Sequence, residues 1–505
     1  MKNLTKTQIK KVEKKAIKNM LFGGLTGLIS KIGALVFTIF LARAFLPELF
    51  GAYSLVLTII LTLMIFTDLG IGQTSARYIS ESLGKKNKIE ARSRFLFLFK
   101  SKLIITILSS TVLFFGAGII SNFFGKPELI PLIRIGSFYL FINGFYSILA
   151  ATSLAIQRIE YSTIGETTFQ IARLGLLFLA IFFYKSLENI FWVLVIALSL
   201  ASLVVLFFLS KNHSFLFVGK KTPVERRRMF KFSGFLALSG FTLIIFTNID
   251  KIFLGYFLEL KFLGFYTSIL TLVGGVLGLL GFFGVMLPIF TQLKGDDLKI
   301  AFRKTFHYLS IIVFPCSIGL AFIALPTLKL LYGDAYVPAE YSFAILLSAI
   351  FLSLLIIEAS FSGIYRTLLT SKERVKILMF TNLSASIINV LLNIVLIISL
   401  IKINPSYGLI GVATATFLSR YGALVAIAII TKKRLNISPN KQSILKPLFA
   451  SLIMLTYLFV FDYFIQLTIP TRIIMIISAA IIYFLTIFLI KAMSFSEVKK
   501  IIKIY

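Results

Sequence analysis

The sequence is nearly free of the residues that build disulfide frameworks and metal centres. Its 505 residues include one cysteine, Cys316, and two histidines, His213 and His307. One thiol cannot form an internal disulfide. Both histidines fall at the predicted cytoplasmic edges of apolar segments, where neither can relay protons across a membrane or complete a metal site with the other. We therefore expect no metal.

Motifs for nucleotide binding and enzyme chemistry are also missing. The sequence has no Walker loop and no cysteine–histidine cluster. It also lacks the long outer loop in which a membrane glycosyltransferase or ligase would carry its catalytic residues. We therefore expect no enzymatic activity and no cofactor. Any transport would have to draw on ion gradients, membrane potential or substrate supply.

Acidic residues are scarce, and the resulting positive charge needs an explanation. Asp and Glu number 20 against 52 Lys and Arg, which gives a net charge of +32. In a soluble protein this excess would suggest a nucleic-acid partner. Here most of the basic residues lie near connections that are predicted to be on the same side of the membrane as the N-terminus. Cytoplasmic loops are enriched in Lys and Arg, so the charge predicts that both termini are cytoplasmic, and we expect no nucleic-acid partner.

Long apolar segments dominate the chain. Hydrophobic residues make up 58% of it, and the mean hydropathy is +0.95. A helix of about 20 apolar residues crosses the ~30 Å hydrocarbon core of a bilayer and satisfies its own backbone polar groups there. Hydropathy predicts about fourteen such spans, at residues 20–43, 52–73, 102–124, 129–156, 163–184, 189–210, 231–258, 262–291, 305–332, 340–366, 376–401, 406–431, 447–468 and 470–491.

An internal repeat divides these spans into two sets. Residues 41–58 read LARAFLPELFGAYSLVLT, and residues 254–271 read LGYFLELKFLGFYTSILT. At a constant offset Gly51 matches Gly264 and Tyr53 matches Tyr266. Six predicted helices separate the two copies, so the repeats are parallel. Chance matching among leucines is the alternative, but the shared Gly-x-Tyr register favours duplication.

The predicted architecture is an all-α integral membrane protein with two parallel-repeat six-helix lobes and a C-terminal helix pair. We expect an amphipathic cytoplasmic segment at 1–19, a first lobe at 20–210 and a cytoplasmic linker at 211–230. A second lobe follows at 231–431, then the helix pair at 447–491 and a cytoplasmic tail at 492–505. In the N-terminal segment, apolar residues recur at helical spacing among lysines, which suits a helix lying on an anionic membrane surface.

Two stretches of the chain resemble a known family. Residues 41–80 and 248–293 are similar to regions of Wzx-type oligosaccharide and polysaccharide flippases, which belong to the multidrug/oligosaccharidyl-lipid/polysaccharide (MOP) exporter superfamily. Span count and lobe order extend the likeness over nearly the whole chain. The resemblance implies a transporter that moves a lipid-linked oligosaccharide, a polyprenyl-pyrophosphate glycan, across the cytoplasmic membrane by alternating access in polysaccharide biosynthesis.

The superfamily leaves one alternative function open, because it also contains multidrug and cation exporters. Their substrates are cationic and would need an acidic cavity, whereas acidic and basic residues are about equally common in these spans. The flippase interpretation implies three partners, namely the lipid-linked oligosaccharide, membrane lipids and polysaccharide-assembly proteins. We expect a monomer.

Charged side chains inside the spans are the candidate site residues, because a charge in hydrocarbon is costly unless it is paired or faces water. We expect four cations to attract an anionic head group in a cavity between the lobes: Lys31, Arg173, Lys251 and Arg420. Snorkelling or structural pairing is the alternative for Lys31, and an interfacial position is the alternative for Arg420. Four carboxylates are candidates for coupling or pairing: Asp68, Glu166, Asp250 and Glu358.

Two polar stripes add to this set. Glu166, Gln170 and Arg173 share one helix face and form either a hydrogen-bonded ladder or a cavity wall. A second stripe at i, i+4, i+7 and i+11 consists of Asn382, Ser386, Asn389 and Asn393. We predict that its asparagines, Asn382, Asn389 and Asn393, line the substrate cavity. Hydrogen bonds between helices are the alternative.

Overall fold

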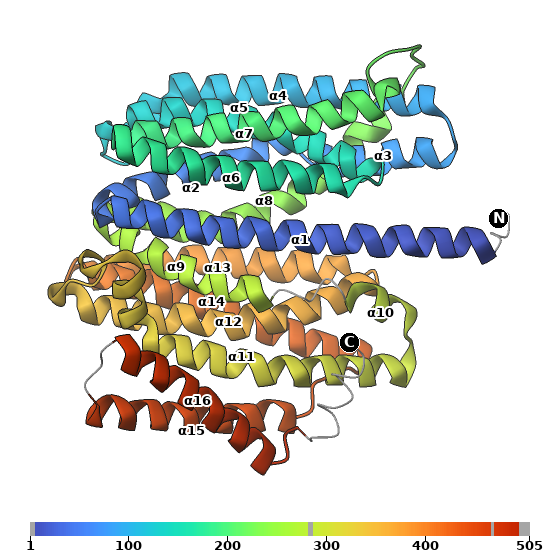
Figure 1. Ribbon diagram of the computed structural model, residues 1–505. Coiled ribbons are helices and arrows are strands. Elements are labelled where there is room, and N and C mark those ends of the chain that lie inside the picture. Colours follow the sequence, from blue (N-terminus) through green and yellow to red (C-terminus); the bar gives the residue numbers. More distant parts are fainter. Residues whose placement is uncertain (1–5, 281–285, 466–468, 494–505) are drawn as a thin grey trace. The chain divides into compact units, whose positions relative to one another are not determined.

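The computed structural model describes residues 6–280, 286–465 and 469–493, with side chains from Phe22 onward except at 235, 238–246, 287, 288 and 469. Among these residues the regular elements are all helical. The chain divides into two compact units, residues 1–267 and 268–505. Figure 1 shows the helices of each unit running along one another, joined by short turns.

The first unit consists of α1 (Lys6–Ala44), α2 (Pro47–Asp68), α3 (Ile71–Gly84), α4 (Lys88–Phe123), α5 (Ile130–Ala155), α6 (Ile159–Phe183), α7 (Leu187–Asn212), α8 (Arg226–Phe257) and the first residues of α9 (Leu260–Leu280). Helix α5 packs between α4 and α7, and α6 packs between α7 and α1.

The second unit contains the rest of α9, then α10 (Met286–Gln292), α11 (Gly295–Tyr332), α12 (Ser342–Ser371), α13 (Val375–Ile401), α14 (Tyr407–Leu435), α15 (Gln442–Phe464) and α16 (Ile469–Leu489). Helix α12 packs against α11 and α14, and α13 packs against α14. The predicted C-terminal pair, α15 and α16, packs together, with α15 against α11.

The predicted membrane architecture is confirmed. Thirteen helical segments of the described residues are long and apolar enough to cross a bilayer. Helix α8, whose side chains are only partly described, has 32 residues and coincides with the predicted span 231–258. With α8 included, these fourteen segments correspond one to one with the fourteen predicted spans, although the segment of α2 also contains α3 and the predicted span 262–291 also reaches into α10. The side chains of the predicted amphipathic segment and the tail from residue 494 lie outside the described part of the chain.

Helix α3 was not expected, because hydropathy assigned residues 77–100 to a cytoplasmic connection. Its buried residues fall at helical spacing along one face: Ile71, Thr74, Ser75, Tyr78, Ile79 and Ser82. Four of these six are polar or aromatic, so the stripe has a low mean hydropathy. The break before α3 occurs at Leu69 and Gly70, which both have left-handed backbone conformations. These two residues end α2 inside the predicted span 52–73.

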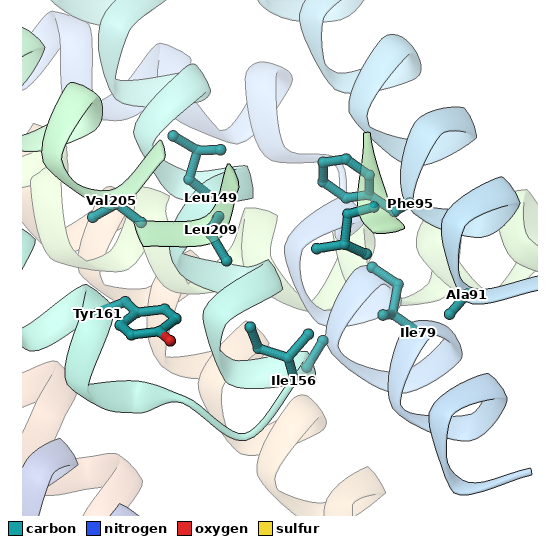
Figure 2. Packing of buried hydrophobic residues seen from close by; sticks show 10 residues of the cluster. Ile79, Ala91, Phe95, Leu149, Ile156, Tyr161, Val205 and Leu209 are labelled. Carbon is teal, nitrogen blue, oxygen red and sulfur yellow. The ribbon is translucent and has the colours of Figure 1, made fainter. Parts of the chain in front are cut away.

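A cluster of buried apolar side chains joins five helices of the first unit. Figure 2 shows its members converging from α3 to α7, with Phe95 of α4 near Ile79 of α3 and Tyr161 of α6 near Val205 and Leu209 of α7. Leu216, from the turn after α7, is also buried in it. This cluster fixes the end of the unit from which the α3–α4 turn extends.

The two copies of the repeated motif contact each other within the first unit. A Cβ on Gly51 of α2 would overlap the carbonyl oxygen of Leu260 and lie 2.6 Å from its carbonyl carbon. A Cβ on Gly264 of α9 would overlap the carbonyl oxygen of Pro47 and lie 2.9 Å from its carbonyl carbon. Pro47 and Leu260 are equivalent positions in the repeat, so the contact is reciprocal. Only glycine permits two backbones to approach this closely.

We predict that Gly51→Ala and Gly264→Ala each destabilise the protein by about 1–3 kcal/mol, because the added methyl group meets backbone that cannot move aside. Thermal unfolding of the detergent-solubilised protein would measure the loss. Gly175→Ala is the matched control, because a Cβ at Gly175 meets nothing within 4 Å. Equal stability of all three variants would contradict the close contact.

Candidate functional site

Arg173 of α6 is the most buried of the four predicted cations. The residue is 8% exposed, and its guanidinium carbon lies 4.7 Å from the ring centre of Phe37 and 4.9 Å from that of Phe169. Its Nε and Nη2 atoms are buried without a hydrogen-bond partner. The aromatic faces attract the cation but leave two of its donor atoms unused. Arg173 therefore retains hydrogen-bonding capacity for an anion.

The stripe that leads to Arg173 is partly a hydrogen-bonded ladder. Gln170 donates from Nε2 to Oε1 of Glu166 at 2.6 Å, while its own Oε1 is buried and unpartnered. A Cβ at Gly33 of α1 would lie 2.7 Å from the Gln170 carboxamide carbon, so glycine makes room for this side chain. Lys31, by contrast, is exposed on α1. The structure groups Glu166, Gln170 and Arg173 but leaves Lys31 apart.

Lys102 of α4 is a buried cation that the sequence interpretation missed. Its ammonium donates to Oδ1 of Asp68 at 2.9 Å, and the Lys102 side chain is 1% exposed while that of Asp68 is 46% exposed. The backbone N–H of Gly72 also donates to Oδ1 of Asp68. Lys102 begins a predicted span, where hydropathy treats a lysine as part of the cytoplasmic edge. Its burial depends on how α2, α3 and α4 pack.

The last turns of α8 hold two further predicted residues. Asp250 is buried and accepts a hydrogen bond at Oδ2 from the Tyr266 hydroxyl at 3.0 Å. Lys251 is half-buried on the adjacent part of the helix surface. Neighbouring residues of a helix point in different directions, and Asp250 finds its donor on α9. Tyr266 belongs to the repeated Gly-x-Tyr motif.

In the second unit, the structure brings together a carboxylate and a cation from different helices. Glu358 of α12 is 3% exposed and accepts a hydrogen bond from Ser362 at 2.5 Å. Nη1 of Arg420, from α14, lies 4.0 Å from the other oxygen of Glu358. Arg366, near the end of α12, donates to the side-chain oxygen of Asn382 at 3.4 Å. This cluster places two arginines around one buried carboxylate.

The asparagine stripe of α13 makes hydrogen bonds to α14 and within itself. Asn389 donates from Nδ2 to the hydroxyls of Ser419 and Thr416, at 3.1 and 3.4 Å. Asn393 donates to the backbone and side-chain oxygens of Asn389, at 2.9 and 3.1 Å. Both asparagines are buried, whereas Asn382 is half-buried. The bonds of Asn389 to α14 are hydrogen bonds between helices, which was the alternative to cavity lining. A role of the three asparagines in substrate binding stays a prediction.

No group of three or more His, Cys, Asp or Glu side chains that could hold a metal ion occurs in the described residues.

Comparison with known proteins identifies the kind of protein that has this fold. A family model for polysaccharide biosynthesis proteins matches residues 40–340. No curated protein matches the chain significantly. Among solved structures, the lipid II flippase MurJ, in an inward closed conformation, is similar with a TM-score of 0.70 and 16% sequence identity, over 92% of this chain and 98% of MurJ.

Two transporters of the MATE type are also similar in fold. An inward-facing multidrug resistance MATE family transporter of the MOP superfamily matches with a TM-score of 0.63 and 12% identity, over 80% of this chain and 95% of its own. A eukaryotic MATE transporter matches with a TM-score of 0.57 and 14% identity, over 87% of this chain and 99% of its own. At these identities the likeness shows the fold, which is that of two-lobe membrane transporters.

We predict that Asp68→Asn destabilises the protein more than Lys102→Met. The first change leaves a buried ammonium without a counter-charge, which costs about 3 kcal/mol or more. The second leaves Asp68, which is 46% exposed and can be solvated. Thermal unfolding in detergent would rank the variants, and the double variant should be more stable than Asp68→Asn alone. The reverse ranking would contradict the burial of Lys102.

Proposed function

We propose that this chain, which belongs to the family of polysaccharide biosynthesis proteins, carries a lipid-linked oligosaccharide across the cytoplasmic membrane. The transported head group is a pyrophosphate-linked glycan, and its polyprenyl tail stays in the bilayer. The protein alternates access between the two sides and makes or breaks no covalent bond. The fold resembles that of MurJ, which is named for flipping lipid II.

One contrast among the polar groups of the spans supports an anionic substrate. Each predicted carboxylate already accepts a hydrogen bond or faces a cation: Asp68 from Lys102, Glu166 from Gln170, Asp250 from Tyr266, and Glu358 from Ser362 and near Arg420. Arg173, in contrast, is buried with two donor atoms unused. A guanidinium with unused donor atoms in a span is costly unless a ligand or water reaches those atoms. A phosphate fits its geometry through paired N–H donors.

Within the second unit, we propose Arg420 as a residue that contacts phosphate. Its distance of 4.0 Å from Glu358 is at the limit of an ion pair, and Glu358 keeps its hydrogen bond from Ser362 if Arg420 turns away. A phosphate can therefore attract Arg420 without leaving the buried carboxylate unpartnered. We propose that Lys31 and Lys251 add to the attraction of the anionic head group. Lys31 is exposed and Lys251 is half-buried, so both side chains have room to move.

Multidrug export is the alternative within the superfamily. A site for a cationic drug needs a carboxylate whose charge is available. Here cations lie at two of the four candidate carboxylates, Lys102 at Asp68 and Arg420 near Glu358, and the likeness to MATE transporters is one of fold. The cations at these two carboxylates favour the flippase function over cation export.

The proposed orientation places both termini, the α3–α4 turn and the linker after α7 in the cytoplasm. Exposed lysines and arginines cluster in the α3–α4 turn and in the linker after α7, as the distribution of basic residues in membrane proteins predicts. An anionic head group that moves outward gains about 2.3 kcal/mol per charge for each 100 mV of interior-negative potential. We further propose that the duplicated lobes span 20–210 and 231–431 and that a single chain performs transport.

We predict that Arg173→Gln and Arg420→Gln each reduce flipping of a lipid-linked oligosaccharide by about tenfold or more, because each removes a contact to phosphate. Purified protein in liposomes that contain the fluorescent lipid-linked sugar would give the rate, read out by quenching of the outward-facing head group.

Arg434→Gln is the control, because Arg434 is an exposed cation in the last turn of α14. Unchanged flipping in both site variants, with wild-type folding, would refute the assignment of the site. Transport of a lipophilic cation by the wild type, without transport of the lipid-linked sugar, would replace the proposed function by drug export.

A further inference from the structure

A basic surface forms where the α3–α4 turn meets the linker between α7 and α8. Arg92 of α4 is buried and reaches across to the linker backbone. Its Nη2 donates to the carbonyl oxygen of Phe217 at 2.9 Å, and its Nη1 donates to those of Lys220, at 3.0 Å, and Gly219. Next to it, the Ser93 hydroxyl accepts a hydrogen bond from the backbone N–H of Thr222 at 2.8 Å.

The linker is also held by apolar contacts. Leu216 is fully buried in the cluster of Figure 2, and the ring of Phe217 packs edge-on to that of Phe95, with 5.4 Å between ring centres. The ammonium of Lys88 lies 5.6 Å from the ring centre of Phe215. Two segments that lie more than 120 residues apart in the sequence are thus fixed side by side.

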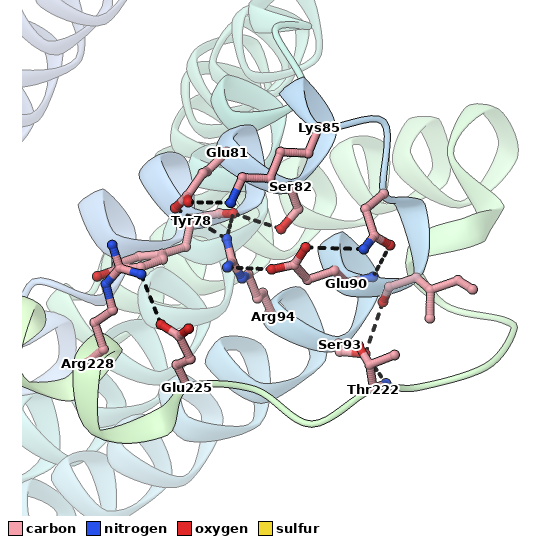
Figure 3. Close-up of polar contacts among 12 residues, drawn as sticks. Tyr78, Glu81, Ser82, Lys85, Glu90, Ser93, Arg94, Thr222, Glu225 and Arg228 are labelled. Atoms are coloured by element: carbon pink, nitrogen blue, oxygen red, sulfur yellow. Dashed lines mark hydrogen bonds and ion pairs between the residues drawn. The ribbon is translucent and has the colours of Figure 1, made fainter.

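The carboxylates of these two segments are all engaged in ion pairs. Figure 3 shows Arg94 between Glu81 and Glu90, and Arg228 beside Glu225. Their N–O distances are 3.4 Å to Glu81, 2.5 Å to Glu90 and 3.0 Å between Arg228 and Glu225, and Lys85 adds a pair of 2.9 Å to Glu81. These carboxylates are therefore not available to neutralise other cations.

Six exposed cations of the two segments form no ion pair with a carboxylate in the described part of the chain: Lys86, Lys88, Lys220, Lys221, Arg226 and Arg227. We call them the linker surface. Exposed apolar side chains lie in the same segments, with Val218 being 76% exposed and Ile89 44% exposed. A surface that mixes uncompensated positive charge with apolar groups is suited to an acidic partner that also carries apolar side chains.

The length of α4 places the α3–α4 turn, which carries Lys86 and Lys88 of the linker surface, away from the bilayer. The helix has 36 residues and is about 54 Å long, whereas the hydrocarbon core is about 30 Å thick. The predicted span starts at Lys102, so the first fourteen residues of α4 extend about 20 Å beyond the core. Head groups take up about 5–7 Å of this distance, and electrostatic attraction to them is largely screened beyond about 10 Å at physiological salt. For Lys86 and Lys88, at the α3–α4 turn, a cytoplasmic protein is therefore a better match than the membrane surface.

We propose that the linker surface docks an acidic segment of a cytoplasmic protein. Orientation in the membrane alone would require only scattered charges near span ends. The hydrogen bonds that Arg92 and Ser93 form with the linker, which we call the clamp, hold the cations of two distant segments in one surface. An orientation signal would not require this fixed arrangement. The proposal rests on the proposed orientation but not on the transport site, since none of these residues lies in that site.

The test uses the full-length protein in nanodiscs of neutral phosphatidylcholine and a fluorescein-labelled polyglutamate peptide, with binding followed by fluorescence anisotropy. Lys220→Glu with Lys221→Glu should weaken binding about tenfold or more, because like charges then face the peptide. Lys432→Glu with Lys433→Glu, the same charge change at exposed lysines of α14, should leave binding within about twofold.

A second variant tests the clamp itself. Arg92→Gln releases the linker although the buried Arg92 cannot touch the peptide, so it should weaken binding more than Arg434→Gln, which removes one exposed charge. Flipping of the lipid-linked sugar should be unchanged in Lys220→Glu with Lys221→Glu.

Three results would overturn the proposal. Equal losses in the linker and α14 variants would show that diffuse charge binds the peptide. Wild-type binding by Arg92→Gln would show that the assembled surface is not needed. Absence of peptide binding, together with retention of phosphatidylglycerol by the wild type but not by the linker variant in native mass spectrometry, would assign the surface to anionic lipid instead.

Discussion

The cost of an unpaired charge in hydrocarbon governs the polar interior of this protein. A buried charge in a span must find a partner, water or a ligand. Lys102 meets this requirement through Asp68, and Glu358 meets it through Ser362 and Arg420. Arg173 meets it only in part, through two aromatic rings. The exception is informative because the four candidate carboxylates and Lys102 each have a hydrogen-bond partner, and it is the reason why we propose substrate recognition at Arg173.

The membrane fold and its family could be predicted from the sequence, because hydropathy sums over about twenty residues and tolerates local errors. The repeat could also be predicted, since Gly51 and Gly264 occupy equivalent positions and the structure brings each against the other copy. Helix α3 was not predicted, because the method depends on hydropathy and this helix has little of it. Its buried face contains Thr74, Ser75 and Ser82, which lower the hydropathy of a helix that is nevertheless packed on one side.

The sequence identified the charged residues of the candidate site, but it did not identify most of the residues that contact them. Position within a span identifies Asp68, Asp250 and Glu358 as groups that need partners. Their partners come from other helices. Tyr266 of α9 bonds to Asp250, and Lys102 of α4, which hydropathy assigns to the cytoplasmic edge of a span, bonds to Asp68. Sequence periodicity fixes which residues share a helix face, but it does not say which helix that face meets. For this reason the helix to which Asn389 bonds could not be named before its contacts with α14 were seen.

Helix α8 links the duplication to the mechanism. In the repeat it is the first helix of the second copy, yet it belongs to the first compact unit. The hydroxyl of Ser233 donates to the carbonyl oxygen of Leu69 near one end of α8, and the ammonium of Lys126 donates to that of Gly255, at 2.7 Å, near the other. Gly255 also lacks the Cβ that would collide with Leu55. Because α8 is attached to the first unit at both ends, any rearrangement that returned it to the second copy would have to break these contacts together. A rocking motion of alternating access would therefore carry α8 together with the first unit.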